Sequence, residues 1–283
     1  MRNYYKNLTI VLIAYKSEKK IFDFVKKIPK KIKTIIIENS NNLELKKKIE
    51  KKYKNIKVFI KKNDGVSSSI NYAVKKIKTE YFLQISPDIL FDYKKIDTFF
   101  KVAIKLNNKF SALGPRFTNA NKKSHKQISR HLKIGSISSV HGSCMFIKKK
   151  IFKELGGFDK NFFLYFEETD YCKRALSRNL KSYQINNIKV KSKGRTVSIK
   201  NKKEKKILGN ILIWHFIWSK FYFTKKNYGI ILSILIFIPV LIRTIFKIGI
   251  YILMDNKENK DRYCYRLSGL ITSMMGRSAS LRP

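Results

Sequence analysis

Short apolar runs alternate with longer amphipathic segments from residue 8 to residue 85, and this alternation limits the possible folds more than any other feature of the chain. The runs are rich in Ile, Val and Leu, as is usual for strands buried in a parallel sheet. The predicted strands are Leu8–Ala14, Ile32–Ile37, Ile56–Ile60 and Tyr81–Ile85, and the predicted helices between them are Glu18–Ile28, Leu43–Tyr53 and Val66–Ile77. Later residues predict strands at Ser111–Leu113, Ser143–Ile147, Ser182–Ile185 and Ile188–Val190, helices at Tyr93–Leu106 and Lys149–Leu155, and a polar loop at Gly114–Ile134. This order predicts an α/β fold with a doubly wound, mainly parallel, Rossmann-like sheet.

Polar residues follow each of the first four predicted strands. The strand ends to be compared carry Ala14, Tyr15 and Ser17 at the first strand, Glu38, Asn39 and Ser40 at the second, Asn63, Asp64 and Gly65 at the third, and Ser86, Pro87 and Asp88 at the fourth. In an open parallel sheet, ligands bind at the edge where the carboxyl ends of the strands meet. We therefore expect these residues to converge in space.

A second organised stretch runs from His141 to Arg178 and contains a Gly-Gly break, an aromatic loop and three acids. The acids are Glu167, Glu168 and Asp170. The start of a helix favours negative charge, so each acid alone is explained as a capping residue. Three carboxylates within four residues also repel one another, which indicates a cation to be bound or a proton to be moved.

Both stretches resemble glycosyltransferase family 2, in particular its rhamnosyltransferase-like branch, over roughly residues 7–200. The second stretch carries the resemblance in Gly142-Ser143-Cys144-Met145, Gly156-Gly157-Phe158-Asp159, Phe162-Phe163 and Tyr165-Phe166-Glu167-Glu168-Thr169-Asp170-Tyr171-Cys172-Lys173-Arg174. The first stretch carries it in Ala14-Tyr15-Lys16-Ser17, Glu38-Asn39-Ser40, Asn63-Asp64-Gly65, Asn71-Tyr72-Ala73 and Ser86-Pro87-Asp88. The resemblance implies a GT-A fold and an inverting glycosyltransferase that uses a nucleoside diphosphate sugar.

The resemblance also implies roles for individual residues. Glu168 would be the catalytic base, Asp170 would be the second candidate for base or would orient Glu168 or a basic side chain, and Glu167 would complete the acid group. Nucleotide-sugar contacts are implied for Ala14, Tyr15, Ser17, Glu38, Asn39, Ser40, Asn63, Gly65, Asn71 and Asp88. Asp88 would bind the diphosphate with Mg²⁺ or Mn²⁺. Contacts to the acceptor or sugar are expected for His141, Gly142, Gly157 and Phe158.

Three departures from the family pattern bear on catalysis and on metal binding. A Glu stands at position 168 and a Ser at position 86, where the family has Asp and Asn. The family often places a histidine after the predicted strand Ile188–Val190, whereas this chain has Lys191-Ser192-Lys193. Either cationic side chains neutralise the diphosphate there, or the domain is a degenerate transferase within a non-catalytic membrane-associated scaffold.

The net charge of +43, from 62 Lys and Arg against 19 Asp and Glu, predicts an anionic partner or reflects a compositional bias. We expect no nucleic acid, because no nucleic-acid-binding module is recognisable. The three cysteines, Cys144, Cys172 and Cys264, show no metal-ligand spacing. They fit a reducing, cytosolic-facing compartment.

The last part of the chain differs in kind, which predicts a catalytic domain over residues 1–205 and a helical, aromatic-rich, membrane-associated region over residues 206–283. Ile230–Met254 is almost wholly apolar and long enough to span a bilayer. Arg243 and Lys247 within it favour an element lying in the membrane plane over a full span or a buried helical bundle. Trp214, Trp218 and Tyr222 are spaced to share one helical face, which is predicted to lie at headgroup level.

These features predict a peripheral or monotopic protein on the cytoplasmic face of the inner or plasma membrane, with a single span as the alternative. The predicted partners are a nucleoside diphosphate sugar, an anionic membrane surface and a lipid-linked or glycan acceptor. The pathway implied by the resemblance is the biosynthesis of cell-surface polysaccharide.

Overall fold

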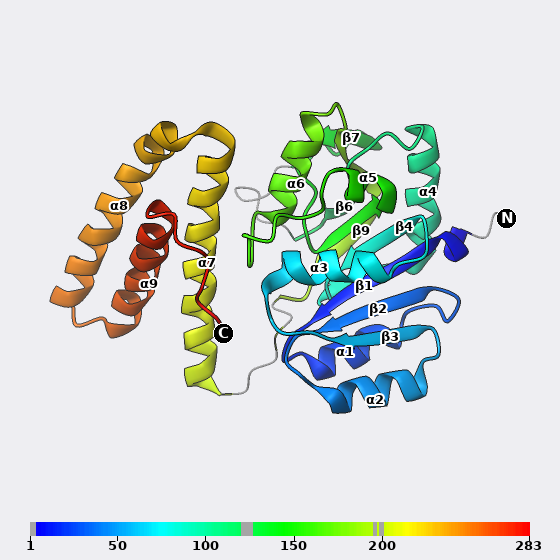
Figure 1. Ribbon diagram of the computed structural model, residues 1–283, viewed down its shortest axis with the longest axis horizontal. Helices are drawn as coiled ribbons and strands as arrows, with labels where there is room; N and C mark the ends of the chain where they lie inside the picture. The colour runs from blue at the N-terminus through cyan, green and yellow to red at the C-terminus, as the bar shows by residue number, and fades with distance from the viewer. Residues whose placement is uncertain (1–3, 120–126, 195–196, 198–200) are drawn as a thin grey trace. The chain divides into compact units, whose positions relative to one another are not determined.

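The computed structural model describes residues 4–119, 127–194, 197 and 201–283 (Figure 1). Contacts divide the chain into two compact units. The first contains Met1–Asp159 and Glu167–Ser198, and the second contains Lys160–Phe166 and Ile199–Pro283. This division cuts the chain near the predicted boundary at residue 205, and it also assigns an internal loop to the second unit.

The first unit is built on a nine-stranded sheet in the order β3-β2-β1-β4-β8-β6-β9-β5, with β7 paired to β9. Its strands are β1 (Leu8–Ala14), β2 (Lys33–Glu38), β3 (Ile56–Ile60), β4 (Tyr81–Ile85), β5 (Ile89–Leu90), β6 (Leu113–Phe117), β7 (Ile134–Ile137), β8 (Cys144–Lys148) and β9 (Ser182–Ser192). The first four strands are parallel to one another. β8 runs antiparallel to β4 and to β6, so the second half of the sheet is mixed.

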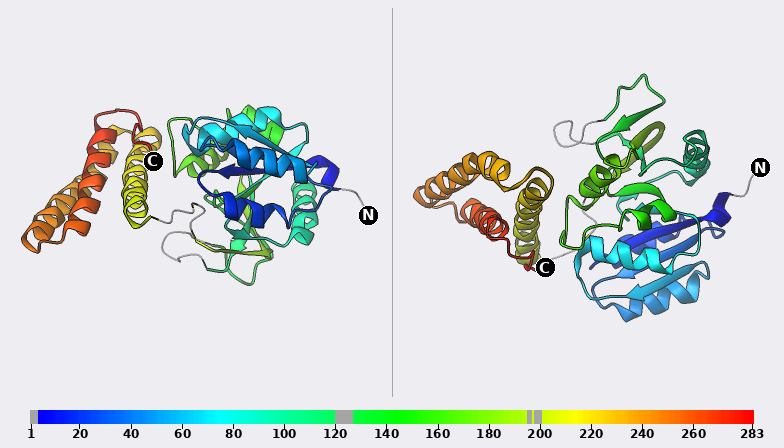
Figure 2. Two further views of the ribbon diagram at one scale, coloured as in Figure 1. Left: turned by 90° about the horizontal axis from the view of Figure 1, so that it is seen from below. Right: turned by 45° about the horizontal axis from the view of Figure 1, so that its top comes forward.

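Helices cover both faces of this sheet (Figure 2). They are α1 (Glu18–Val25), α2 (Leu43–Lys52), α3 (Gly65–Lys76), α4 (Ile96–Lys105), α5 (Lys149–Glu154) and α6 (Glu167–Leu176), with single 3₁₀ turns at Tyr4–Asn7 and Tyr93–Lys95. α1, α2 and α4 pack on the face that presents Leu8, Ile10 and Leu12 of β1. α3, α5 and α6 pack on the opposite face around Val11. The doubly wound α/β architecture is confirmed.

The two strands predicted between residues 182 and 190 form the single strand β9. The register is irregular where it pairs with Pro115 and Arg116 of β6. Asn186 interrupts the apolar pattern there, but its Nδ2 donates to the carbonyls of Ser129 (2.8 Å) and Leu132 (2.6 Å). The strand continues because this buried amide is fully bonded inside the protein.

The predicted loop Gly114–Ile134 is wrong at its start, because β6 extends to Phe117. Gly and Pro usually mark turns, and here Pro115 sits where the register shifts, a place at which a strand tolerates proline. Residues 120–126 of this loop, including His125, lie outside the described residues.

In the described part of the second unit there are three helices, α7 (Lys202–Tyr228), α8 (Ile230–Leu253) and α9 (Lys257–Met274). Asn201 caps α7 by accepting a hydrogen bond from the backbone of Lys203 at 2.8 Å. Gly229, with a φ of +85°, separates α7 from α8, a conformation that glycine adopts without strain. Of the apolar stretch of α8, 17% is buried within the protein. The alternative of a buried helical bundle therefore does not describe α8.

The predicted placement of the α7 tryptophans at headgroup level is wrong. Trp214 and Trp218 are 4% and 3% exposed. Their indole N–H groups donate to Ser268 at 3.3 Å and to the carbonyl of Arg277 at 3.1 Å. The four-residue spacing was correctly assigned to one helical face, but that face packs inside the second unit.

Candidate active site

The end of β4 and the start of β8 are bonded side by side. The backbone N–H of Ser86 donates to the carbonyl of Ser143 at 2.9 Å. The Gln84 amide of β4 donates to the carbonyl of Gly142 at 2.6 Å. These bonds place the His141–Ser143 turn beside the residues that follow β4. The two stretches that carry the family resemblance therefore meet here.

Glu168, in the first turn of α6, lies against this turn. A Cβ built on Gly142 would come within 3.2 Å of the Glu168 carboxyl carbon, so a side chain there would require the carboxylate to shift by a few tenths of an ångström. Burial raises the pKa of Glu168, and hydrogen bonds from backbone groups, including that of Gly142, partly oppose the rise. A partly buried carboxyl group with a raised pKa suits a residue that accepts a proton.

Glu167 is 6% exposed and has no hydrogen-bond partner for its Oε2 atom among the described residues. Burial raises its pKa well above the usual range, and the neighbouring Glu168 raises it further. The two carboxyl groups therefore disfavour simultaneous ionisation, as adjacent acids in one site do.

Asp170 is the third acid and has a different environment. It is fully buried, and its Oδ2 accepts a hydrogen bond from Arg174 Nε at 2.8 Å. The same guanidinium donates to the carbonyl of Gly157 at 2.6 Å and to that of Leu155. Asp170 thus orients a basic side chain, which ties α6 to the Gly-Gly turn.

Asp88 stands two residues beyond Ser86 and is 8% exposed. Its Oδ2 accepts a hydrogen bond from Ser192 Oγ at 2.7 Å, and its carbonyl accepts one from the backbone of Lys193 at 2.8 Å. Ser192 therefore occupies the place beside Asp88 for which the resemblance suggests a histidine. This contact could not be predicted from the sequence, because the two side chains lie 104 positions apart in the chain.

The residues around Asp88 fit a metal ion that is held mainly by phosphate oxygens of a bound nucleotide and by water. Among the described residues, no group of three or more His, Cys, Asp or Glu side chains could hold a metal ion. Mg²⁺ often takes one or two protein carboxylates and completes its shell with phosphate oxygens and water. Asp88 alone can serve in that way.

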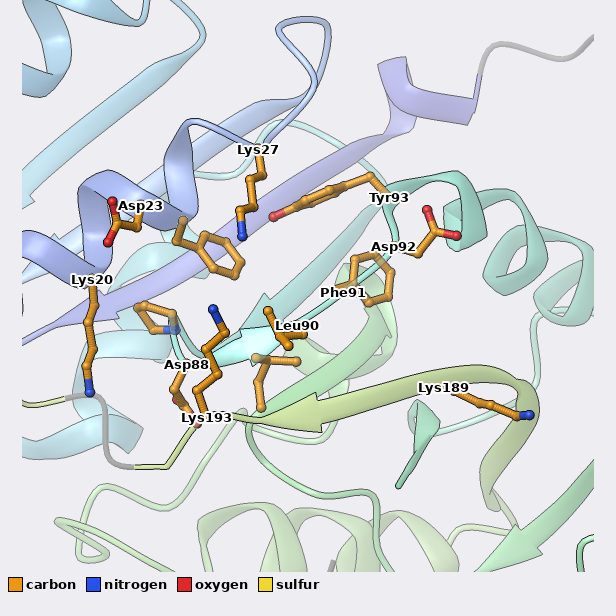
Figure 3. A pocket seen from close by; sticks show the side chains of 13 residues that line it. Lys20, Asp23, Lys27, Asp88, Leu90, Phe91, Asp92, Tyr93, Lys189 and Lys193 are labelled. Atoms are coloured by element: carbon orange, nitrogen blue, oxygen red, sulfur yellow. The ribbon is translucent and has the colours of Figure 1, made fainter. Parts of the chain in front are cut away.

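A cavity of about 360 Å³ adjoins Asp88 on the side of α1 (Figure 3). It is lined by Lys20, Asp23, Phe24, Lys27, Pro87, Asp88, Ile89, Leu90, Phe91, Asp92, Tyr93, Lys189 and Lys193. Figure 3 shows the amino groups of Lys27 and Lys193 pointing into it, whereas Lys189 points away. Positive charge therefore lies next to Asp88.

The residues after β1 and β2 also converge. The backbone N–H of Asn39 donates to the carbonyl of Ala14 at 2.8 Å, and that of Lys16 donates to Ser40 Oγ at 3.2 Å. Tyr15 N–H donates to Ser17 Oγ at 3.3 Å, which closes the first turn.

Glu38 is 1% exposed, and its carboxylate serves the loop that follows it. It accepts hydrogen bonds from the backbone of Ser40 at 2.9 Å and of Asn42 at 2.7 Å, and also from the Ser40 hydroxyl. Asn39 bonds to Ser69 of α3 at 2.8 Å. These internal hydrogen bonds set the conformation of the turn after β2 at the carboxyl edge of the sheet.

Three of the predicted nucleotide-sugar contacts, Asn63, Gly65 and Asn71, lie on α3 or directly before it. Asn63 accepts from the backbone of Gly65, the first residue of α3, at 3.4 Å. The Asn71 amide clamps the backbone of Phe158, donating to its carbonyl at 2.7 Å and accepting from its N–H at 2.9 Å. A Cβ on Gly157 would lie 2.6 Å from Asn71 Oδ1, and the Phe158 side chain is 1% exposed. Asn71, Gly157 and Phe158 therefore hold α3 and the Gly-Gly turn together inside the first unit.

His141 is exposed, unlike Phe158. Its Nδ1 lies 2.7 Å from Ser143 Oγ, and its ring packs on Phe117 with centroids 4.6 Å apart. Of the predicted acceptor contacts outside glycine, His141 is the one that solvent reaches. Gln84 and Arg174, which brace this turn and α6, were not singled out from the sequence; a polar Gln in an apolar strand was the available signal.

The chain matches no known protein-family profile. Its sequence is similar to the low-salt glycan biosynthesis hexosyltransferase of Haloferax volcanii, at 24% identity over a 197-residue alignment that covers 62% of this chain and 63% of that protein. An uncharacterized glycosyltransferase of Rickettsia typhi is 30% identical over a 116-residue alignment that covers 36% of each chain. The chain thus spans less than two thirds of the length of either relative.

Solved structures show the same fold at low sequence identity. The mannosyltransferase PcManGT from Pyrobaculum calidifontis, in complex with GDP-Man and Mn²⁺, aligns with a TM-score of 0.58 and 9% identity over 96% of this chain and 88% of its own. GalNAc-T7 with UDP, GalNAc and Mn²⁺ gives a TM-score of 0.55 at 14% identity over 77% and 49%. TarS of S. aureus gives 0.52 at 12% over 73% and 39%. The first unit therefore has the GT-A type of α/β fold, and the sequence relatives are glycosyltransferases.

Proposed function

We propose that this protein is an inverting glycosyltransferase that moves a sugar from a nucleoside diphosphate sugar to an acceptor hydroxyl. The observation that carries the proposal is the Glu168 carboxylate seated on Gly142, on a turn that is bonded to the strand end preceding Asp88. The resemblance assigns a catalytic base and a diphosphate-binding acid to these two positions.

In the proposed reaction, Glu168 accepts the proton of the acceptor hydroxyl as its oxygen attacks the anomeric carbon. The bond from that carbon to the diphosphate breaks on the opposite side, and the nucleoside diphosphate leaves with the bonding electrons. The raised pKa of Glu168 favours proton acceptance near neutral pH. The pKa of Glu167 is also raised, by burial and by Glu168, so Glu167 adds negative charge beside Glu168 less readily than an exposed glutamate would.

Asp88 binds the diphosphate end of the donor in this proposal. A Mg²⁺ or Mn²⁺ ion held by Asp88 and the phosphates would neutralise charge that develops on the leaving group. Lys20 and Lys193 line the adjoining cavity and supply further positive charge. We propose that these lysines replace part of the role of the family's histidine.

The nucleoside end is proposed to lie over the turns after β1, β2 and β3. The residues assigned there are Ala14, Tyr15, Ser17, Glu38, Asn39, Ser40, Asn63, Gly65 and Asn71. Because the carboxylate of Glu38 and the amide of Asn71 are bonded inside the fold, we assign their contribution mainly to the shape of these turns. His141 and Gly142 are the proposed contacts to the sugar or acceptor, and Gly157 and Phe158 support them from below.

The transferred sugar is proposed to be a hexose or rhamnose, and the acceptor a lipid-linked or glycan saccharide of a cell-surface polysaccharide. The support for a lipid-linked acceptor is α8, which is long and apolar enough to cross a membrane and has exposed side chains such as Ile231 (75%) and Leu253 (89%). We propose that the protein associates with the cytoplasmic face of the inner or plasma membrane, in a peripheral or monotopic manner.

A panel of UDP-, GDP- and dTDP-linked sugars with Mn²⁺ tests the proposal through release of nucleoside diphosphate. One of these donors should be turned over, and Glu168→Gln should abolish turnover while donor binding stays within a few-fold. Asp88→Ala should weaken donor binding most when metal is present. A wild-type protein that binds no donor would support the alternative of a non-catalytic scaffold.

A further inference from the structure

The loop Asn161–Phe166, which precedes the acid group, is held along its whole length by α7 within the second unit. Every residue of the loop has a contact with this helix. The contacting pairs are Asn161–Tyr222, Phe162–Tyr222, Phe163–His215, Leu164–Ser219, Tyr165–Phe216, Phe166–Phe216 and Phe166–Phe223. We call His215, Phe216, Ser219, Tyr222 and Phe223 the loop-binding face of α7.

The contacts of the middle of the loop are close. The rings of Phe163 and His215 stack with centroids 4.5 Å apart. The Ser219 hydroxyl donates to the carbonyl of Leu164 at 2.8 Å. These interactions fix both the side chains and the backbone of the loop.

The end of the loop has an unusual backbone. Tyr165 and Phe166 have φ angles of +70° and +69°, a left-handed conformation that bulky side chains rarely adopt. Such a conformation persists when the surroundings over-determine it, and it occurs preferentially at functional sites. The ring of Phe216 lies 5.6 Å from that of Tyr165 and 5.7 Å from that of Phe166, so one side chain supports both strained residues.

The C-terminal tail packs on the same assembly. His215 Nε2 lies 2.8 Å from the carbonyl of Leu281 and donates to it. The Arg282 guanidinium lies 4.3 Å from the ring centroid of Phe163. The tail thus backs the loop-binding face and holds one loop residue directly.

We propose that the loop-binding face of α7 positions Glu168 for proton transfer, with Phe216 as its principal positioning residue. Phe166 is followed directly by Glu167, the first residue of α6, so the backbone direction at Phe166 sets how the chain enters the first turn that carries Glu168. Without Phe216, the two strained residues relax to ordinary φ values and Glu168 leaves its seat on Gly142. This inference rests on the proposed function.

Phe216 is well placed for a test because its side chain is 45% exposed, and its removal leaves the interior of the unit intact. Phe216→Ala removes the support, and Phe216→Tyr retains the ring. Ile207→Ala is the matched control, since Ile207 lies on the same helix and is 44% exposed. All variants are made in the full chain.

The rate is measured as nucleoside diphosphate release from the donor selected in the panel above. Phe216→Ala should lower kcat by about tenfold to a hundredfold, as a misplaced catalytic group does, with KM for the donor changed less than threefold. Phe216→Tyr should restore kcat, and Ile207→Ala should leave it unchanged. In the Glu168→Gln background, Phe216→Ala should leave any residual rate of nucleoside diphosphate release unchanged, because its effect passes through Glu168.

Hydrogen exchange of peptides spanning residues 159–170 supplies a readout that needs no donor. These amides should exchange at least about tenfold faster in Phe216→Ala than in the wild type, and unchanged exchange would overturn the inference. An equal loss of rate from Phe216→Ala with and without Glu168 would also overturn it, while leaving Glu168 as the base. Full activity of Glu168→Gln would instead remove the proposed base, and the inference with it.

Discussion

The carboxyl carbon of Glu168 lies where a Cβ at residue 142 would approach it to 3.2 Å, so a side chain at residue 142 would push the Glu168 carboxylate by a few tenths of an ångström. Gly142→Ala should therefore displace the carboxylate and lower kcat by about tenfold to a hundredfold, with donor binding nearly unchanged. Gly249→Ala is the matched control, because a Cβ at Gly249 meets no atom within 4 Å. Equal kcat in wild type and Gly142→Ala would show that the carboxylate does not need this seat.

The pKa of Glu168 is raised by burial, and Glu167 and Cys172 are its titratable neighbours. Because the proposed base works in its deprotonated form, the rate should fall as pH decreases through the raised pKa. The acid limb of kcat/KM should thus lie above the ordinary glutamate value of about 4.3. A limb at or below that value would mean that another group is the base.

Burial of Glu167 also makes the stability of the protein depend on pH. Its folded-state pKa is raised, so its contribution to stability is present below about pH 4.3, the ordinary value, and is lost as pH rises through the folded-state pKa. Glu167→Gln removes this titration. The melting temperature of Glu167→Gln relative to the wild type should therefore increase from pH 5 to pH 8. The increase should be about 2–4 °C for each kcal/mol by which ionisation of Glu167 lowers the unfolding free energy of the wild type. A difference that is constant with pH would contradict burial as the cause.

Arg174 joins Asp170 to the Gly-Gly turn, and Asp170 is fully buried. Removing one partner of such a pair leaves an uncompensated charge, so Arg174→Leu should lower the free energy of unfolding by about 3–5 kcal/mol. The double variant Arg174→Leu/Asp170→Asn should recover part of this loss, since the buried charge is gone. Denaturant unfolding at pH 7 measures both. Equal stability of the single and double variants would show that the Arg174–Asp170 ion pair does not stabilise the link between α6 and the Gly-Gly turn.

The sequence predicted the structure best where the hydrophobic pattern of a segment matches its burial in the fold. Leu8–Ala14 is apolar except for Thr9 and forms β1 with the predicted bounds. The roles of Asp88 and Glu168, predicted from spacing and resemblance, stay predictions. The sequence was least informative where a side chain has two suitable environments. Trp218 fits a membrane interface or a helix interior equally well by pattern, and contact with the tail decides for the interior.

Contacts between distant segments were also beyond the sequence. Ser192 gave no signal as a partner of Asp88, because a serine in a basic segment has no periodicity that marks it. The left-handed pair Tyr165 and Phe166 could not be foreseen either, since aromatic residues disfavour that conformation locally and only packing on α7 compensates for it.

Leu235 and Ile242 of α8 are seven residues apart, lie on one helical face, and are each 62% exposed. If this face enters the acyl region, two charges placed on it should be strongly unfavourable there. Wild-type protein should sediment with vesicles that contain anionic lipid, and high salt should weaken this binding without abolishing it, because salt screens the charge and not the apolar contact. The variant Leu235→Glu/Ile242→Glu should lose most of the salt-resistant binding and retain donor turnover.

Leu43→Glu on α2 is the matched control for that experiment, since Leu43 is an exposed leucine (56%) of the first unit and should leave vesicle binding unchanged. Substitutions are preferable to a chain cut near residue 205, because such a cut removes the helix that holds the Asn161–Phe166 loop and so changes two properties at once. Equal sedimentation of wild type and the double variant would assign vesicle binding to the basic surface. The exposed face of α8 would then need another partner, and the proposed lipid-linked acceptor would lose its support.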